Sequence, residues 1–526
     1  MPSTRRGTQR FKRLRSLCAA SAVAVLLFGS TAHAAFSFAT VEAKAKALSS
    51  QPYQAPADSL SPQLAALTHA QYQQIHYAPS ARLWAKSGSL FSVGFLARAS
   101  LYHDDVRINE VDAGGVHPIT FNGADFTSGS LKLEPKALDK AGFSGLVIYF
   151  RPPAAHHRKG RTPPPPQNDK VLVFQGASFF HGLVAGQPAG ASARGLAVDT
   201  GLLSGEEFPQ FTEFWIERPA SSDKAMVIDA LMDSKRTTGA FRFALYPGKD
   251  TRVEVTARIF LRNYVTILGI APLNSMYLYG ENDPVHGRDD YRPEVHNSDG
   301  LQIHSGTGEW LWRPLVNPAR MLITSFSMTN PQGFGLMQRD RHFRDYEDLS
   351  ARYGERPSVW VTPEGNWGAG RVELVMLPTP DQTHDNIFAF WVPDTPPPLH
   401  QPLDLSYRIE WQGTDQTRPP SAWVTQTRVG DGFNGAKPGA KNFVVDFDGP
   451  ALAKLPTTAP VNSVVSVNGN GEVLSRRVVH NPVTGGWRMF LSVKRVDDHK
   501  PVELRAYLRN GNNTVSETWS YILPPV

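Results

Sequence analysis

The chain has 526 residues, with 54 basic and 48 acidic side chains, a formal net charge of +6 and one cysteine. Six basic residues and no acidic residue lie before residue 35, so the remainder is close to neutral, which argues against nucleic-acid binding. The cysteine, Cys18, also lies in this first segment, so a chain without it forms no disulfide and depends on its core.

The first 34 residues have the three parts of a secretory signal peptide. A basic start precedes the apolar run Leu17–Phe28, and Ala32-His33-Ala34 supplies the small residues that a signal peptidase recognises. The apolar run is too short to span a bilayer, and no later stretch is apolar enough to do so. We predict export to the periplasm with cleavage before Ala35, and a mature protein that does not span the membrane. A retained N-terminal anchor is the alternative.

The rest of the chain has the pattern of a predominantly antiparallel β protein. Glycine (43 residues) and proline (42 residues) are frequent and bound short runs of alternating apolar residues. Strand-like runs include Lys170–Phe174, Val253–Leu261, Val372–Leu377, Phe443–Phe447 and Arg488–Val493. Helical periodicity is clearest at Phe38–Leu48, where Val41, Ala45 and Leu48 share one face. We therefore predict an all-β fold with few helices.

Two proline-rich segments mark the organisation. Pro152–Asp169 is polar and lacks an apolar period, which predicts an exposed loop. Pro393–Leu403 precedes a block of about 120 residues that has the strand rhythm of an immunoglobulin-like sandwich. We place the signal peptide at 1–34, a large β-sandwich at 35–396 and an immunoglobulin-like β-sandwich at 397–526.

The sequence contains no glycine-rich phosphate loop, metalloprotease helix or Cys/His metal cluster, so we predict no metal and no cofactor. Instead, aromatic residues and carboxylates recur close together, as in Glu309-Trp310 and His384-Asp385-Asn386 before Phe388. Aromatic faces cover the C–H faces of sugars, and carboxylates and amides bind sugar hydroxyls. The pattern suits a saccharide cleft, but the same aromatic residues also suit a sandwich core, and both interpretations stay open.

Several long strings resemble the periplasmic glucan biosynthesis proteins of types G and D. They are Ser192–Thr200, Ser204–Pro209, Leu268–Leu273, Gly308-Glu309-Trp310, Asn330–Leu336 and Ser516–Trp519. The resemblance extends from Ala35 to Tyr521, and the signal peptide together with Phe211–Pro219 is more similar to type G. It implies a large β-sandwich resembling galactose mutarotase, followed by an immunoglobulin-like domain.

The resemblance also implies a function. Family members are needed to make osmoregulated periplasmic glucans with a β-1,2-linked glucose backbone, and some are inverting endo-β-1,2-glucanases with two catalytic aspartates. The second of these aspartates matches Asp385, but the position of the first is Asn297, in His296-Asn297-Ser298-Asp299. An amide does not exchange a proton as a carboxyl does. If this segment is a strand, Asn297 and Asp299 share a face and Asp299 is a substitute, displaced by roughly 6–7 Å.

Two hypotheses follow. In the first, the protein is a β-1,2-glucan hydrolase or transglycosylase that uses Asp385. In the second, Asn297 impairs the site, and the protein binds glucan or contacts the inner-membrane glucan synthase. A glycine-rich segment, Trp423–Phe443, is either a lid over the cleft or an ordinary surface hairpin. Further predicted substrate-binding residues are Glu309, Trp310, Arg313, Tyr346, Asp348, Arg356, Trp360 and Trp367.

Overall fold

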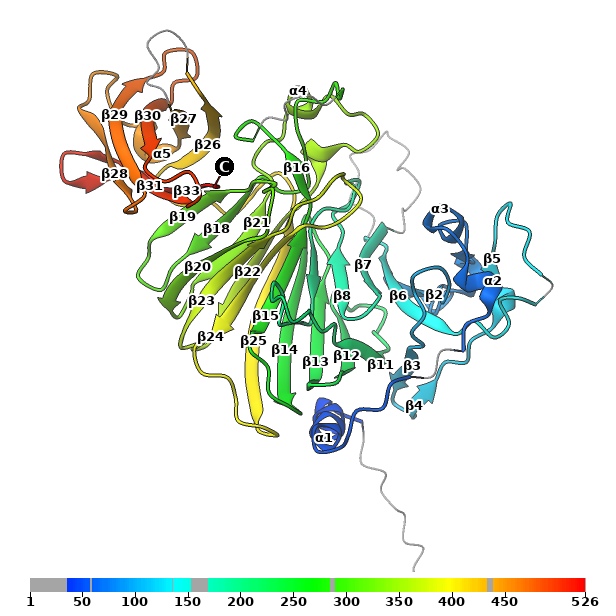
Figure 1. Ribbon diagram of the computed structural model, residues 1–526. Coiled ribbons are helices and arrows are strands. Elements are labelled where there is room, and N and C mark those ends of the chain that lie inside the picture. Colours follow the sequence, from blue (N-terminus) through cyan, green and yellow to red (C-terminus); the bar gives the residue numbers. More distant parts are fainter. Residues whose placement is uncertain are drawn as a thin grey trace, which may run out of the picture. The chain divides into compact units, whose positions relative to one another are not determined.

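A computed structural model describes residues 36–525 except 57–58, 135, 153–168, 284–288 and 433–438. The predicted signal peptide lies outside the described residues, as does nearly all of the proline-rich loop that begins at Pro152. Among the described residues, no helix is long and apolar enough to cross a membrane. The all-β prediction is confirmed, because two large antiparallel-rich sheets form most of the molecule (Figure 1).

The first sheet has ten strands. In spatial order these are β2 (Phe91–Ala97), β6 (Phe143–Phe150), β7 (Asp169–Gln175), β8 (Phe179–Gly182), β9 (Ser192–Arg194), β15 (Leu268–Ser275), β24 (Ile387–Pro393), β23 (Ala369–Met376) and β20 (Leu322–Thr329), with β10 (Leu196–Val198) also paired to β15.

The second sheet has fifteen strands and reaches the C-terminus. In spatial order these are β28 (Val461–Val467), β31 (Val502–Asn510), β33 (Thr518–Leu523), β19 (Trp310–Pro314), β18 (Gly300–His304), β21 (Gly333–Met337), β22 (Ser358–Glu364), β25 (Pro402–Gln412), β14 (Thr251–Leu261), β13 (Thr237–Tyr246), β12 (Met226–Asp233), β11 (Gln210–Glu217), β3 (Arg107–Asp112) and β4 (Gly115–Pro118), with β32 (Asn513–Thr514) paired to β31.

Smaller elements complete the fold. Two strand pairs are β1 (His76–Tyr77) with β5 (Phe126–Thr127), and β16 (Tyr277–Tyr279) with β17 (Val295–His296). A four-stranded sheet contains β26 (Trp423–Gly430), β27 (Ala440–Asp448), β30 (Trp487–Arg495) and β29 (Gly471–His480). The helices are α1 (Phe38–Ser49), α2 (Pro62–Ala65), α3 (His69–Tyr72), α4 (Phe343–Tyr346) and α5 (Pro450–Ala453), and the 3-10 turns are Pro79–Ala81, Gly123–Asp125 and Tyr353–Glu355.

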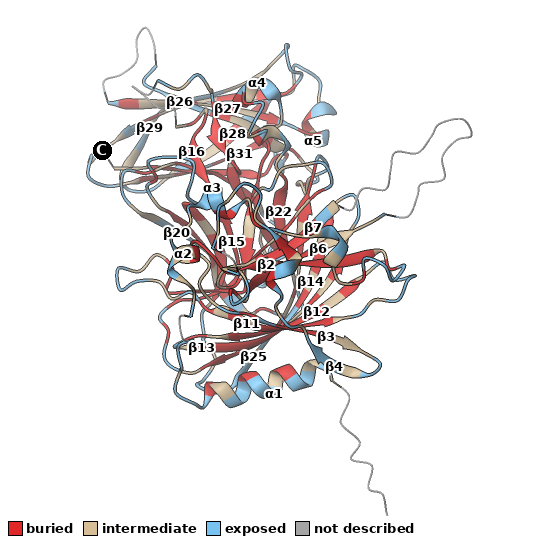
Figure 2. Ribbon diagram, turned by 90° about the vertical axis from the view of Figure 1, so that its right-hand side faces the viewer, coloured by how far each residue is buried: buried red, intermediate tan, exposed pale blue. Residues whose placement is uncertain are grey.

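Period-two burial explains why the two large sheets pack together. Along β14, alternate residues from Val253 to Ile259 are buried, while their neighbours reach the other face. Aromatic residues fill the space between the sheets, and Phe174 contacts both Phe180 and Phe243. Figure 2 shows the buried strands in the interior, with α1 lying across the ends of the second sheet as the sequence predicts for an amphipathic helix.

The smaller sandwich shares a sheet with the larger one. Its four-stranded sheet packs on β28, β31 and β33, with Phe443 against Trp519 and Tyr521. Strand β33 also pairs in parallel with β19. The expected boundary at residue 397 falls before β25, which pairs with β14 and β22 of the large sandwich. The strands of the smaller sandwich therefore begin with β26 rather than at residue 397.

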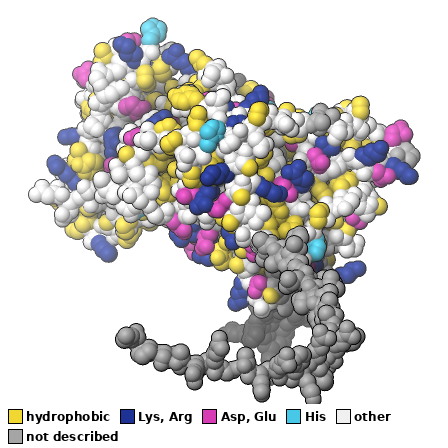
Figure 3. Space-filling view, turned by 90° about the horizontal axis from the view of Figure 1, so that it is seen from below, with side chains coloured by type: hydrophobic (Ala, Val, Ile, Leu, Met, Phe, Trp, Pro, Cys, Tyr) yellow, Lys and Arg dark blue, Asp and Glu magenta, His cyan; other side chains and the backbone are white. Residues whose placement is uncertain are grey.

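Acidic and basic side chains are interspersed on the face of the molecule drawn in Figure 3. This agrees with the near balance of charge outside the first 34 residues.

Candidate functional site

Asp385 lies where the chain enters β24, and its neighbour Asn386 fixes it there. Asn386 is buried; its Nδ2 donates to the carbonyls of Tyr277 (3.0 Å) and Leu377 (2.9 Å), and its Oδ1 accepts from the Tyr277 amide (2.8 Å). Asn386 thus joins β24 to the segment between β15 and β16. Because buried polar groups are held by such bonds, the position of Asp385 is well defined.

The Asp385 carboxyl is exposed to solvent, and no described residue donates a hydrogen bond to it. Crowding by the surrounding protein nevertheless raises the pKa of this carboxyl, and the positive charges of Arg194 and Arg356 partly offset the rise. A carboxyl that water reaches, that has no protein partner and that keeps its proton longer than usual is suited to contact a ligand and to donate a proton. We call Asp385, Arg194 and Arg356 the Asp385 site.

Arg194, at the end of β9, is 1% exposed. Its Nη1 donates to Glu206 Oε1 at 2.5 Å, whereas Nε and Nη2 have no hydrogen-bond partner among the described residues. The guanidinium carbon lies 5.3 Å from the ring centre of Phe179 and 5.4 Å from that of Phe388. Burial lowers the pKa of Arg194, and Glu206 and Asp385 counteract this. The cation therefore acts on the site as well as on its ion-pair partner.

Arg356 approaches Asp385 from the loop before β22. Its guanidinium donates to the carbonyls of Ala351 and Ala189, at 3.2 and 2.9 Å, and lies 4.7 Å from the ring centre of Tyr353. Burial lowers the pKa of Arg356. Its backbone partners hold the guanidinium in place, so the Asp385 carboxyl stays between two fixed cations.

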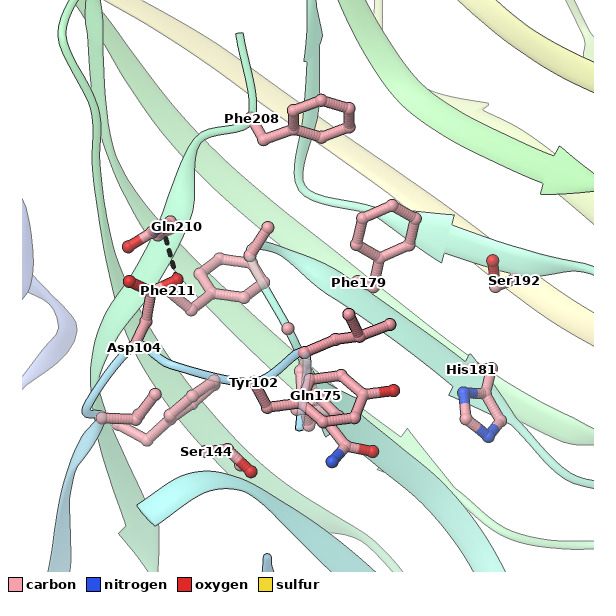
Figure 4. Close-up of a pocket in the computed structure, with 17 residues that line it drawn as sticks. Tyr102, Asp104, Ser144, Gln175, Phe179, His181, Ser192, Phe208, Gln210 and Phe211 are labelled. Atoms are coloured by element: carbon pink, nitrogen blue, oxygen red, sulfur yellow. Dashed lines mark hydrogen bonds between the residues drawn. The ribbon is translucent and has the colours of Figure 1, made fainter. Parts of the chain in front are cut away.

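A cavity of about 530 Å³ adjoins the site, and we call it the aromatic pocket. Phe179 and Phe208 line this pocket and also contact the Arg194 guanidinium. Figure 4 shows their rings together with Tyr102, with His181 and Ser192 along one side. Burial lowers the pKa of His181 to about 4, so its imidazole is neutral at pH 7. Aromatic rings beside neutral polar groups match the chemistry of a sugar surface.

The Asn297 segment lies on the other side of the strand that Asn386 holds. The Asn297 amide donates to the Met276 carbonyl at 2.8 Å, and the hydroxyls of Ser298 and Ser275 are 2.9 Å apart. Two interstrand spacings of about 4.8 Å place the backbones of Asn297 and Asn386 roughly 10 Å apart. The structure therefore brings both family positions to neighbouring segments. The Asn297 side-chain oxygen is buried and has no hydrogen-bond partner among the described residues.

The expected strand through Asn297 and Asp299 is wrong, because these residues form a bend between β17 and β18. Asp299 turns toward β21, where its Oδ2 accepts from the amides of Arg339 (2.8 Å) and Asp340 (3.0 Å). The pKa of Asp299 is raised by burial and lowered by His296 and Arg339. Its charged neighbours thus differ from those of Asp385, which are Arg194 and Arg356.

Asp299 belongs to a second group of acids, the acidic pocket, beneath β26. This small pocket is lined by Glu281, Glu294, His296, Asp299, Asp340 and Thr427, among others. Burial raises the pKa of Glu281 to about 8 and raises that of Asp340 well above its usual range. The ligand atoms of Glu294, His296 and Asp340 lie within 4.8 Å of one another. However, both His296 ring nitrogens are within hydrogen-bond distance of Gln338 or Glu294, so a hydrogen-bond network accounts for the group.

The other predicted binding residues lie in several places. Tyr346 is buried and donates to the Asp340 carbonyl at 2.9 Å, and Asp348 Oδ1 accepts from the amides of Ser350 and Ala351. Arg313 is wholly buried in an ion pair with Glu503 at 2.9 Å. Trp367 is buried against Trp391 and Tyr407, so it is a core residue.

Glu309, Trp310 and Trp360 lie on the second sheet. Glu309 and Trp310 line a different cavity, and Trp310 stacks near Trp360 at 5.9 Å. Only Arg356, of the eight predicted binding residues, is found among the groups that act on the charge of Asp385.

The glycine-rich segment forms the β26–β27 hairpin, and its tip lies outside the described residues. The amide of Thr427 in β26 donates to Glu281 Oε1, and Arg428 Nη2 lies 3.3 Å from Glu281 Oε2. The base of the hairpin thus contacts the acidic pocket. Whether the tip forms a lid stays a prediction.

Sequence reasoning did not identify Arg194 or the aromatic pocket as parts of the site. Arg194 lies in the string Ser192–Thr200, which carried the family resemblance, but nothing local distinguishes it from a surface arginine. Phe179 and Phe208 come from segments about 30 residues apart, and only the packing of β8 against the start of β11 brings them together.

Comparisons with known proteins agree with these observations. The family model described as "Periplasmic glucan biosynthesis protein, MdoG" matches residues 36–523. The chain is 50% identical over 515 residues to "Glucans biosynthesis protein G" of Ralstonia nicotianae, covering 97% of this chain and 98% of that protein. It is 46% identical over 516 residues to the protein of the same name from Pseudomonas aeruginosa, covering 95% and 96%, and 45% identical over 499 residues to that of Serratia proteamaculans, covering 93% of each.

Proposed function

This chain belongs to the periplasmic glucan biosynthesis protein family, and on that premise we propose that it binds the β-1,2-linked glucan backbone at the Asp385 site. One observation carries the proposal: an exposed carboxyl without a protein partner lies between two arginines and beside an aromatic pocket. Carboxylate and arginine groups bind sugar hydroxyls, and the rings of Phe179 and Phe208 cover the C–H faces. The protein would do this in the periplasm, after loss of its first 34 residues.

A second function, cleavage or transfer of the glucan, is favoured by the raised pKa of Asp385. A carboxylic acid that keeps its proton near neutral pH suits a general acid that protonates the leaving glycosidic oxygen. An inverting reaction also needs a carboxylate that activates water, roughly 6.5–9.5 Å away. The family position for this group holds Asn297, and Asp299 lies in the acidic pocket. Binding therefore needs fewer assumptions than hydrolysis.

A partner follows from the same proposal. A protein that holds a newly made glucan in the periplasm would receive it from the inner-membrane glucan synthase. We propose this enzyme as the source of the chain's ligand, with no cofactor required for the transfer.

Product analysis separates the two functions. Purified residues 35–526 are incubated with linear β-1,2-glucan, and the native chain is compared with Asp385→Asn, with Asn297→Asp and with the surface control Asp498→Asn. Shorter or cyclised products that Asp385→Asn reduces by about 10²–10⁴-fold would identify an enzyme. An inert native chain, with activity gained in Asn297→Asp, would identify a binding protein. If the native chain neither binds nor changes the glucan, the proposal fails.

A further inference from the structure

The cavity that Glu309 and Trp310 line is separate from the Asp385 site. It measures about 720 Å³ and lies where β19 and β33 join the two sandwiches. Its lining residues are His304, Thr307, Gly308, Glu309, Trp310, Pro420, Ser421, Tyr507, Thr514, Ser516, Glu517 and Thr518. We call it the junction pocket. The Asn297 bend adjoins one end of β18 and His304 ends the other, so the five-residue strand separates them by roughly 15 Å.

The aromatic part of the junction pocket is a stack of flat rings. The Trp310 ring lies 4.1 Å from that of His304 at 12° and 5.9 Å from that of Trp360 at 19°. Trp310 and His304 are only partly buried and line the pocket. Burial lowers the pKa of His304, so its imidazole is neutral at pH 7. The stack therefore presents an uncharged aromatic surface to the cavity.

Glycines in the sheet allow this arrangement. A Cβ atom at Gly333 would lie 2.2 Å from Trp360 Cζ2, and one at Gly335 would lie 2.8 Å from Trp360 Cε3. Both positions on β21 are thus occupied by glycine where the Trp360 indole packs directly on the backbone. Trp360 in turn supports Trp310 from the side. An aromatic ring held parallel to a sheet in this way is suited to stack on a flat ligand.

The polar part of the pocket faces the same space. Glu309 Oε1 accepts from Arg505 Nη2 (2.6 Å) and Thr518 Oγ1 (2.7 Å), which leaves Oε2 without a hydrogen bond among the described residues. Hydroxyls of Thr307, Ser421, Tyr507 and Thr514 also line the cavity. Glu517 at its base is fixed by Arg339, with N–O distances of 2.6 and 3.0 Å. The pocket thus combines a fixed base with exposed hydroxyl and carboxylate groups.

We propose that the junction pocket is a second saccharide-binding site, which takes one or a few glucose units of a glucan. An aromatic platform beside acceptors and hydroxyls matches a pyranose ring, with its apolar C–H face and its ring of hydroxyls. The inference goes beyond the proposed function, because it concerns a different site and shares with it only the class of ligand. A long glucan held at both sites would bind more tightly than at either one alone.

Calorimetric titration with a short linear β-1,2-gluco-oligosaccharide, too short to reach both sites, tests the proposal. The titration uses the Asp385→Asn protein, so that no turnover interferes. We expect two binding events per chain, with one weakened at least about tenfold by Trp310→Ala and preserved in Trp310→Phe. Tyr264→Ala, which removes an exposed aromatic residue elsewhere, serves as the control and is expected to change neither event.

The outcomes separate this inference from the proposed function. An event that Trp310→Ala removes supports the junction pocket even if nothing binds at the Asp385 site. A single event unaffected by Trp310→Ala overturns the inference and leaves the Asp385 site intact, and absence of saturable binding overturns it as well. If Trp310→Ala folds poorly, Thr307→Arg obstructs the pocket from its exposed hairpin, and unchanged binding by that variant has the same meaning.

Discussion

Asn386 connects three backbone groups near the Asp385 site, so Asn386→Ala tests how that site is held. The substitution leaves the Tyr277 amide, the Tyr277 carbonyl and the Leu377 carbonyl without their partner. Each buried group left unpaired costs about 1–3 kcal/mol, and partial relaxation brings the total to about 3–5 kcal/mol. Unfolding entropy of about 2.1 cal/mol/K per residue over the roughly 490 residues after the signal makes each kcal/mol about 1 °C. We therefore expect the melting temperature to fall by about 3–5 °C.

Differential scanning calorimetry measures this shift, with Asn513→Ala on the exposed strand β32 as the matched control. Glucan affinity, measured below the melting transition, is expected to fall as well, because Asp385 is adjacent in the chain and loses its fixed position. A melting temperature within about 1 °C of the native value would refute the role assigned to Asn386.

Arg194→Met removes a cation that lowers the pKa of Asp385, so a carboxyl NMR titration should show the pKa of Asp385 move upward, as should the alkaline limb of any activity. The pKa of Glu281 is raised from 4.5 to about 8, so the folded state keeps a proton that the unfolded state loses. This lowers stability as pH rises from about 4.5 to about 8, and Glu281→Gln should make melting temperature depend less on pH across that window. Gly333→Ala places a methyl group against Trp360 and should destabilise the fold by about 1–3 kcal/mol in denaturant unfolding.

Matched variants give these three predictions their controls. Arg356→Met should shift the pKa of Asp385 in the same direction as Arg194→Met but by less, because Arg356 is the weaker influence. Gly469→Ala adds a methyl group where no atom lies within 4 Å and should leave stability unchanged. An unmoved pKa of Asp385, an unchanged pH dependence in Glu281→Gln, or equal stability of the two glycine variants would each contradict the corresponding argument.

The sequence predicts the fold well because the fold depends on periodicity. Alternating burial along β14 and the apolar face of α1 are both visible in the residues themselves. The domain boundary was less accurate, because proline-rich punctuation at residue 397 precedes β25, and strand pairing rather than composition assigns β25 to the large sheet. Register and sheet order depend on contacts far apart in the chain, which no local pattern encodes.

The site is predicted less completely for the same reason. Asp385 was found by its motif, but the structure gives Asn386 a structural role that the motif alone does not reveal. The acidic pocket is assembled from Glu281, Glu294, Asp299 and Asp340, which lie in four separate segments. Aromatic residues near carboxylates were equally compatible with core and with binding, and the structure contains both: Trp367 is core, whereas Trp310 lines a cavity.

The most direct test of the central claim is a structure of the Asp385→Asn protein with linear β-1,2-glucan bound. The account predicts a glucose unit within hydrogen-bond distance of residue 385, with further units against Phe179 and Phe208 in the aromatic pocket. Glucan bound only at the junction pocket, or at neither place, would contradict the claim that the Asp385 site is where this protein holds its ligand.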